Sequence, residues 1–196
     1  MEPIILASSS PRRQEILKML KIPFRVIIPN IDETVLSAIE TEQIPELLAR
    51  QKITEVIHSL PPKQEIPWVL GADTIVTQNG KIFGKPQSVE EAVEFLKLFQ
   101  GNTHTTITAL ALYNGRTKNI TTRICKTQVT FNPMSEEEIQ WYVDTGEWHG
   151  AAGGYRIQSL ASIFIKKIEG SYSNVIGLPI FELYDILKEQ GYSLLE

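Results

Sequence analysis

The chain has 196 residues, and its 19 basic and 23 acidic side chains give a formal net charge of −4. This length predicts a single domain over residues 1–196, which could have two lobes, and the chain is long enough to bury a sizeable core. A hydrophobic fraction of 42% and a charged fraction of 21% exclude wholesale disorder, collagen and a coiled coil. The net negative charge argues against a general nucleic-acid-binding protein, because such a protein needs a broad basic face.

Cysteine content and hydropathy indicate the compartment. Cys125 is the single cysteine, so it has no partner for an intramolecular disulfide, and we expect it to pack as a small apolar residue. The N-terminus lacks the basic and long apolar segments of a signal peptide. No stretch approaches the ~20 apolar residues of a membrane helix. We therefore expect a cytoplasmic protein with no membrane partner.

Hydrophobic periodicity and turn residues predict alternating strands and helices. Capping boxes start two helices, at Ser88 with Glu91 and at Ser135 with Glu138, and Asn-Gly pairs at 79–80 and 114–115 predict hairpin turns. The predicted strands are 4–7, 24–28, 68–76, 105–113, 120–131 and 163–168, and the predicted helices are 10–22, 46–57, 88–100, 135–143 and 179–189. Strands and helices interleave with hairpins in the middle, which predicts an α/β fold around a mixed sheet.

Two of these helices have a predicted buried face. The buried stripe of the 88–100 helix is expected to contain Val89, Ala92, Val93 and Leu96. The corresponding stripe of the closing helix is expected to contain Ile180, Leu183, Tyr184 and Leu187.

A serine-rich segment before the first predicted helix is the first candidate site. Residues 8–13 are Ser-Ser-Ser-Pro-Arg-Arg, with Ser10 as the N-cap and Pro11 as the first helical residue. A helix N-terminus presents unpaired N–H groups and a partial positive charge, so anions bind there. Arginines at this end oppose the helix dipole, which indicates a function such as phosphate binding. A serine cap with two solvated arginines is the simpler alternative.

An acidic residue inside an apolar strand is the second candidate. Asp73 lies in the run Gly71-Ala72-Asp73-Thr74, and an unpaired buried carboxylate is costly. Asp73 is therefore paired, a metal ligand or a catalytic group, unless it caps a neighbouring turn. Lys85, in Gly84-Lys85-Pro86 after the first hairpin, could reach a phosphate as a point charge or be a solvated loop lysine.

Two glycine-containing segments in the second half of the chain could line a pocket. Residues 150–158 run through small residues into Tyr155 and Gln158, and a glutamine amide can contact a base edge with one donor and one acceptor. A flexible loop is the alternative there. Residues 169–179 carry Gly, Ser and Asn into Pro179, and they are either a pocket lining or structural. Lys52 and Glu33 are by themselves uninformative charges.

In their order along the chain, these segments resemble the Maf family, also called septum-formation proteins. The matching motifs are Leu6-Ala7-Ser8-Ser9-Ser10-Pro11-Arg12-Arg13, Gly71-Ala72-Asp73-Thr74, Gly84-Lys85-Pro86, Tyr155-Arg156-Ile157-Gln158 and Gly177-Leu178-Pro179. The resemblance implies a mixed twisted sheet flanked by helices, with a deep central cleft, as in inosine-triphosphate pyrophosphatases. It also implies hydrolysis of a nucleoside triphosphate to the monophosphate and pyrophosphate, assisted by a divalent cation such as Mg²⁺ or Mn²⁺.

The resemblance further indicates the base that is accepted. Arg12, Thr74 and Gln158 match positions associated with base selection in the branch that acts on dTTP and UTP, and modified pyrimidine nucleotides are further candidates. The alternatives are the branch that prefers methylated GTP and a non-catalytic, nucleotide-binding regulator of septum formation. Departures from the family pattern, which bear on base preference, stand at Ala151, Arg156 and Ser159-Leu160-Ala161.

The expected chemistry distributes the remaining roles. Asp73 would accept a proton from water, hold the metal, or do both, with Glu33 as a second metal-binding carboxylate. The predicted phosphate-binding residues are Ser8, Ser10, Arg13, Lys52 and Lys85. We expect a nucleoside triphosphate as the partner and no nucleic acid, with homodimer formation left open. The implied biological role is nucleotide house-cleaning or arrest of cell division.

Overall fold

The structure is a computed structural model of the 196-residue chain, and it describes residues 1–31, 39–61 and 65–194. The chain divides into two compact units. The first unit comprises Met1–Asp73, Thr108–Cys125 and Gly177–Glu196, and the second comprises Thr74–Ile107 and Lys126–Ile176.

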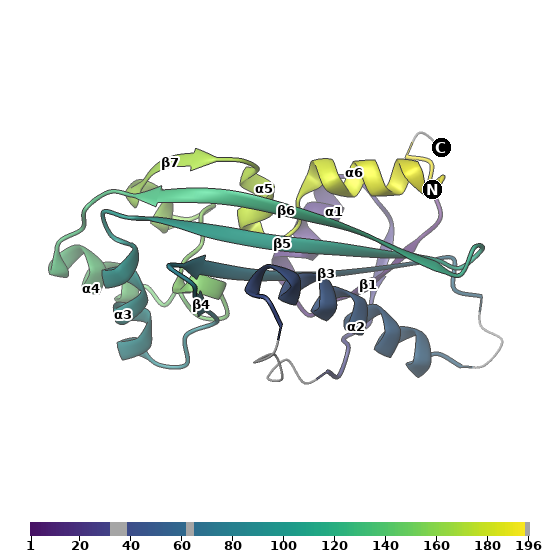
Figure 1. The fold of residues 1–196 in the computed structure, drawn as a ribbon, viewed down its shortest axis with the longest axis horizontal. Helices are drawn as coiled ribbons and strands as arrows, with labels where there is room; N and C mark the ends of the chain where they lie inside the picture. The colour runs from purple at the N-terminus through teal and green to yellow at the C-terminus, as the bar shows by residue number, and fades with distance from the viewer. Residues whose placement is uncertain (32–38, 62–64, 195–196) are drawn as a thin grey trace. The chain divides into compact units, whose positions relative to one another are not determined.

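The described residues form a seven-stranded mixed sheet with flanking helices (Figure 1). The strands are β1 (Ile4–Ala7), β2 (Phe24–Val26), β3 (Trp68–Gln78), β4 (Lys81–Phe83), β5 (Thr103–Asn114), β6 (Asn119–Phe131) and β7 (Ile165–Glu169). The helices are α1 (Pro11–Met19), α2 (Ile44–Ser59), α3 (Val89–Phe99), α4 (Glu136–Asp144), α5 (Tyr172–Ile176) and α6 (Ile180–Glu189), with 3₁₀ turns η1 (Thr41–Gln43), η2 (Ala152–Gly154) and η3 (Leu160–Phe164).

The strand order is β2-β1-β3-β5-β6-β7, with β4 paired to β3. Strand β1 is parallel to both β2 and β3, whereas β4 on β3 and β7 on β6 are antiparallel. This arrangement confirms the predicted α/β class and its mixed sheet.

In the first unit, β1 lies between β2 and β3, and helices lie on both sides of these strands. Its four residues are all buried, which explains why the sequence shows an uninterrupted apolar run there. Ala49, Ile53 and Val56 of α2 pack against Ile5 of β1 and Val69 of β3. Figure 1 shows α2 on one side of the strands and α6 on the other.

In the second unit, an aromatic core joins α3, β4 and β6. Phe83 lies edge-on to Phe95 and Phe99, with ring centroids 5.0 and 4.8 Å apart. Phe131 of β6 and Tyr142 of α4 complete this core and are almost fully buried. Edge-to-face pairs of this kind add about 0.5–1.5 kcal/mol each beyond the area that they bury.

Helix starts follow the predicted caps, with one difference. Ser135 and Glu138 form a complete capping box. Ser88 accepts the Glu91 N–H as predicted, but the Glu91 carboxylate accepts the backbone N–H of Gln87 rather than that of Ser88. The capping box predicted at Ser88 and Glu91 is therefore only half formed.

The predicted buried faces of two helices are partly wrong. Helix α3 buries Ala92, Phe95, Leu96 and Phe99. Val89 is 45% exposed, because Phe95 and Phe99 lie on the inner face and turn the first residue of the helix outward. In α6 the buried residues are Leu183, Ile186 and Leu187, while Tyr184 is 46% exposed.

The predicted hairpin turns differ in their local structure. Asn79-Gly80 forms the tight β3–β4 turn, in which Gln78 pairs with Lys81 and both central residues have positive φ. The second turn is longer, since β5 ends at Asn114 and β6 begins at Asn119. Gly115 is small for another reason: a Cβ atom there would lie 1.7 Å from the Ile66 carbonyl oxygen.

Two further expectations concern a strand and the cysteine. The predicted 163–168 strand begins later, at Ile165, because residues 160–164 form η3. Cys125 is buried in β6, as expected for a packing residue.

No helix in the described part of the chain has the length and apolar character needed to span a membrane.

Candidate functional site

The serine-rich segment forms the junction between β1 and α1 in the first unit. Ser10 is the N-cap and Pro11 the first helical residue, as predicted, but the Ser10 side chain forms no capping hydrogen bond with any described residue. Instead the buried Ser8 hydroxyl oxygen accepts the Ser10 N–H at 3.2 Å. No acidic residue lies in the first turn of α1. This helix N-terminus therefore keeps the positive character that favours an anion.

Arg13 is buried and holds this junction in place. Its Nη1 donates to Ser8 Oγ at 3.0 Å, and its Nε donates to the Gly177 carbonyl oxygen at 2.8 Å. The Gly177-Leu178-Pro179 motif thus lies beside the serine-rich motif, 164 residues away in the chain. These contacts give Arg13 a structural role, and its binding to phosphate stays a prediction. Arg12 lies beside it in the first turn of α1 and is half-buried.

Gly71 allows α2 to lie directly on β3. A Cβ atom at this position would be 2.5 Å from the Ala49 carbonyl oxygen and 2.9 Å from the Ile53 side chain, so only glycine permits this packing distance. Lys52 is one turn beyond Ala49, and Asp73 is two residues beyond Gly71 on the same face of the strand. The close approach therefore brings Lys52 opposite Asp73.

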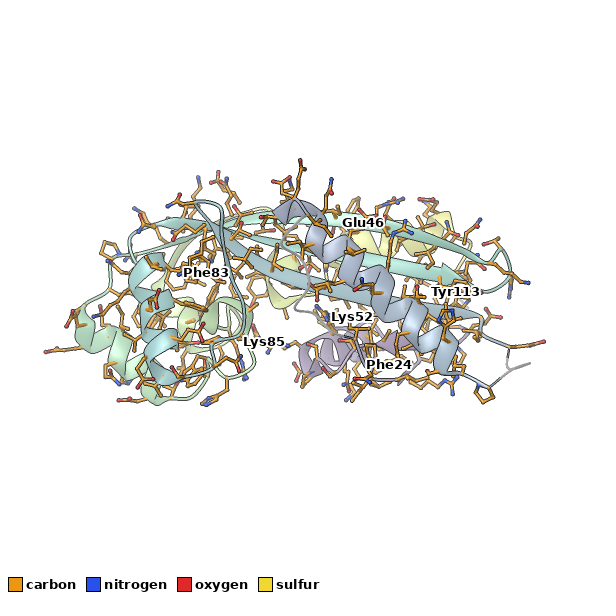
Figure 2. The ribbon with its side chains drawn as sticks, turned by 60° about the horizontal axis from the view of Figure 1, so that its bottom comes forward. Phe24, Glu46, Lys52, Phe83, Lys85 and Tyr113 are labelled. Atoms are coloured by element: carbon orange, nitrogen blue, oxygen red, sulfur yellow. The ribbon has the colours of Figure 1, made fainter. Side chains whose placement is uncertain are left out.

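Lys52 and Asp73 form a buried ion pair in the first unit. The distance from Lys52 Nζ to Asp73 Oδ1 is 2.5 Å, and the two side chains are only 9% and 10% exposed. Figure 2 shows Lys52 on the inner side of α2. A pair buried in this way is weak evidence for stability, because desolvation offsets much of the attraction. The pair therefore gives no strong stability argument for placing two charges in the interior of the first unit.

In the second unit, the segments around Lys85 and Gln158 are joined through backbone contacts. The Gly153 N–H donates to the Gly84 carbonyl oxygen at 2.9 Å. A Cβ atom on Gly154 would lie 3.3 Å from Pro86 Cγ. Lys85 itself is exposed on the loop after Phe83, which Figure 2 labels. The residues just before Tyr155 therefore lie against the Gly84-Lys85-Pro86 loop, about 70 residues away in the chain.

Gln158 stands exposed at the end of a buried segment of the second unit. Tyr155 and Ile157 are buried, whereas Gln158 lies in a turn with its side chain exposed. The Gln158 amide is therefore exposed, while the buried side chains of Tyr155 and Ile157 fix the backbone just before it. Thr74, the other predicted base-selecting residue of this unit, is half-buried in β3.

The sequence comparisons name the family. The model of the Maf family, described as "Maf-like protein", matches residues 3–190. The chain belongs to the Maf family.

Relatives within this family are similar over their whole length. A dTTP/UTP pyrophosphatase of Pelotomaculum thermopropionicum is 43% identical over 195 residues, which cover 100% of both chains. A dTTP/UTP pyrophosphatase of Desulforamulus reducens is 44% identical over 194 residues, covering 99% of this chain and 100% of that one.

Among solved structures the likeness is weaker. A nucleoside-triphosphatase (dITP/XTP pyrophosphatase) of Mycobacterium abscessus has a TM-score of 0.40 and 11% identity over 68% of this chain and 76% of that chain. The Staphylococcus aureus Ham1 protein has the same TM-score and 18% identity over 67% of this chain and 71% of that chain. Likenesses of this size carry no information about the function of this Maf-family chain.

Asp73 is the predicted metal ligand that lies among the described residues. No group of three or more His, Cys, Asp or Glu side chains in residues 1–31, 39–61 and 65–194 is placed to hold a metal ion. Glu33, the predicted second carboxylate, lies outside the described residues. Mg²⁺ is commonly held by one or two carboxylates together with substrate phosphates and water. Asp73, whose carboxylate is paired with Lys52, would supply one such carboxylate, and a bound triphosphate would supply further oxygen ligands.

The departures from the family pattern have local structural partners in the second unit. The Arg156 side chain donates from Nη2 to the His149 carbonyl oxygen at 2.9 Å. Ser159 Oγ donates to Oε1 of Glu147, and the Leu160 N–H donates to Oε2 of the same carboxylate at 3.1 Å. These contacts connect residues 156–160, on both sides of Gln158, to the loop that follows α4.

Sequence reasoning missed His104, which is 1% exposed in β5. Its Nε2 lies 2.7 Å from the Tyr155 hydroxyl oxygen, and its ring stacks on Phe99 at 4.2 Å. A histidine between threonines in a strand gives no signal of such a contact. The aromatic character of Tyr155 was visible in the sequence, but its hydrogen-bond partner was not.

Burial of His104 predicts a pH-dependent stability. Burial lowers the pKa of His104 from 6.5 to about 3. Between these values the unfolded chain binds more protons than the folded one, so the free energy of unfolding falls as the pH falls. The free energy of unfolding keeps its full value at pH values well above 6.5, and at pH 5 it is lower by about 2 kcal/mol.

Urea unfolding at pH 7 and pH 5 tests this expectation. A His104→Phe variant should lose about 2 kcal/mol less than the wild type on this change of pH. His58→Phe, at an exposed position near the end of α2, is the control and should follow the wild type. Equal losses for the wild type and His104→Phe would contradict the prediction.

Proposed function

We propose that this Maf-family protein is a nucleoside triphosphate pyrophosphatase that hydrolyses dTTP and UTP to the monophosphate and pyrophosphate. The observation that carries the proposal is the buried Asp73–Lys52 pair, with its 2.5 Å contact, in a chain that the family model matches over residues 3–190. Relatives at 43% and 44% identity are named dTTP/UTP pyrophosphatases, which supports the choice of nucleotide.

The reaction breaks the bond between the α-phosphorus and the oxygen that bridges to the β-phosphorus. In the proposed mechanism, a water oxygen attacks the α-phosphorus while Asp73 accepts the water proton, and pyrophosphate leaves with the bridging oxygen. Lys52 holds the Asp73 carboxylate in place and adds positive charge. Catalysis of this kind depends mostly on positioning and electrostatic stabilisation.

The triphosphate needs cationic and hydrogen-bonding partners. We propose that the N-terminus of α1, with Ser8, Ser10 and Arg13, and the exposed Lys85 contact phosphate oxygens. A divalent cation, Mg²⁺ or Mn²⁺, would be held by Asp73 and the phosphates and would neutralise phosphate charge. In the proposed assignment, Arg12, Thr74 and Gln158 select the base.

The cellular context is also a proposal. A pyrophosphatase that acts on free nucleotides needs access to the nucleotide pool, which fits a cytoplasmic location. A role in nucleotide house-cleaning or in septum formation would follow from control of that pool. Homodimer formation stays a prediction.

A nucleotide panel tests the proposed reaction. Pyrophosphate release is measured with Mg²⁺ for dTTP, UTP, CTP, GTP and a methylated GTP, and dTTP and UTP are expected to give the highest kcat/KM. Highest activity on methylated GTP would assign the chain to the other branch. Binding of dTTP without pyrophosphate release would favour a non-catalytic regulator.

Gln158→Ala should loosen base discrimination more than it lowers total turnover. A lost hydrogen-bonding pair costs about 1–3 kcal/mol, so the preference for dTTP over CTP should fall about 5- to 150-fold. The same panel measures this change. Gln140→Ala is the matched control, because Gln140 is exposed on α4 and its amide donates to Asp144. An unchanged substrate ranking for Gln158→Ala would remove Gln158 from base selection.

A further inference from the structure

The backbone that carries Gln158 is anchored by two tyrosine hydroxyl groups within the second unit. The Tyr155 hydroxyl oxygen lies 2.7 Å from His104 Nε2, and both residues are buried. The Tyr142 hydroxyl accepts the backbone N–H of Arg156 at 3.3 Å. Two successive residues of the segment are therefore tied to different elements, β5 and α4.

Both anchors lie in apolar surroundings, which makes their hydrogen bonds costly to lose. His104 stacks on Phe99 with ring centroids 4.2 Å apart, and Tyr155 lies edge-on to Phe131 at 5.1 Å. Burial raises the pKa of both tyrosines, that of Tyr142 to about 12, so both hydroxyls stay protonated. A hydrogen bond in such surroundings is stronger than one in water, and an unpaired partner would carry the full desolvation cost.

Base selection by a glutamine depends on where the backbone that carries it is held. Uracil and thymine present a carbonyl oxygen and an N–H at neighbouring positions, whereas cytosine presents an amino group and a ring nitrogen. A glutamine amide that rotates by 180° exchanges its donor and its acceptor and can pair with either pattern. The amide therefore has to meet the base edge at one fixed place, and the position of the backbone that carries the side chain sets that place.

We infer that His104 and Tyr142 are positioning residues for base selection, acting through Tyr155 and Arg156 on Gln158. The inference rests on the proposed function, since it assigns a role in choosing dTTP and UTP over CTP. Neither residue belongs to a predicted site motif, and both act without touching the nucleotide. Gln158 has an exposed side chain, whereas Ile157 before it is buried, so the anchors fix the backbone up to the residue that makes the contact.

The test compares tyrosine-to-phenylalanine variants, which remove one oxygen atom each. Tyr155→Phe and Tyr142→Phe should each lower the ratio of kcat/KM for dTTP to kcat/KM for CTP about 3- to 10-fold, mainly through a higher KM for dTTP. Tyr192→Phe is the matched control, because its hydroxyl donates to the Glu2 carbonyl oxygen at 2.7 Å in the first unit. Tyr192→Phe should keep the wild-type ratio.

A double variant separates positioning from stability. In His104→Phe/Tyr155→Phe both hydrogen-bonding groups are replaced by apolar rings, so the midpoint of thermal unfolding should recover relative to Tyr155→Phe. The dTTP-to-CTP ratio should stay low, because the directional contact is still missing. Recovery of the ratio together with stability would overturn the inference, and so would an unchanged ratio in both single variants. If the wild type releases no pyrophosphate from dTTP, the proposed function itself fails.

Discussion

Replacing Asp73 with asparagine is expected to abolish pyrophosphate release from dTTP while the protein stays folded. Asparagine keeps the shape and can still accept a hydrogen bond from Lys52, but it cannot accept the water proton. It also leaves the buried Lys52 ammonium without its counter-charge, so the free energy of unfolding should fall although the fold is kept. Loss of a general base typically lowers the rate about 10²- to 10⁴-fold. Pyrophosphate release in the presence of Mg²⁺ measures the rate, and thermal unfolding checks the fold.

The matched control is Asp185→Asn. Asp185 also pairs with a cation of the first unit, since its Oδ2 lies 2.8 Å from Arg123 Nε, but this pair is half-exposed on the surface. Asp185→Asn should keep wild-type activity and change stability by less than about 1 kcal/mol. Near-wild-type activity of Asp73→Asn would contradict the assignment of Asp73 as the proton acceptor.

Replacing Lys52 with methionine should cost both activity and stability. The variant leaves the Asp73 carboxylate buried without its ammonium partner, and breaking a buried pair in this way costs about 3–5 kcal/mol. It also removes a positive charge from the phosphate-binding region. Urea unfolding measures the loss of stability, and the pyrophosphate assay measures the loss of activity.

Adding Asp73→Asn to Lys52→Met gives a sharper test of the same pair. The double variant has no uncompensated buried charge, so it should regain part of the stability lost in Lys52→Met and none of the activity. Lys97→Met is the control, because Lys97 pairs with Glu136 on the surface and should matter by less than about 1 kcal/mol. If the double variant were less stable than Lys52→Met, the pair would not be coupled as the 2.5 Å contact indicates.

Local sequence signals predicted much of the secondary structure. The 4–7 strand, the helix start at Ser10-Pro11 and the Ser135 capping box are confirmed because each depends on residues close together in the chain. The buried faces of α3 and α6 were partly mispredicted, since periodicity alone does not say which of two adjacent apolar stripes faces the core. Phe95 and Ile186 occupy inner positions that the sequence pattern left open.

Candidate residues were recognisable from their chemistry, but their partners were not. Asp73 stood out as a carboxylate in an apolar strand, and the family resemblance placed Lys52 among the phosphate-binding residues. The contact between these two residues came only from the structure. The same holds for Tyr155, whose aromatic side chain was visible in the motif while its contact with His104 was not. The roles of the predicted site residues in binding and catalysis stay predictions.

By itself, the sequence determined the α/β class, the ordered motifs of the Maf family and the residues that carry charge or hydrogen-bonding groups. Such features depend on residue type and on short spacings, which the chain displays directly. Only the tertiary structure decided that Gly71 lets α2 approach β3, that Arg13 joins Ser8 to Gly177, and that two tyrosines anchor the Gln158 segment. These contacts link residues between 5 and 164 positions apart in the chain, and packing sets their distances.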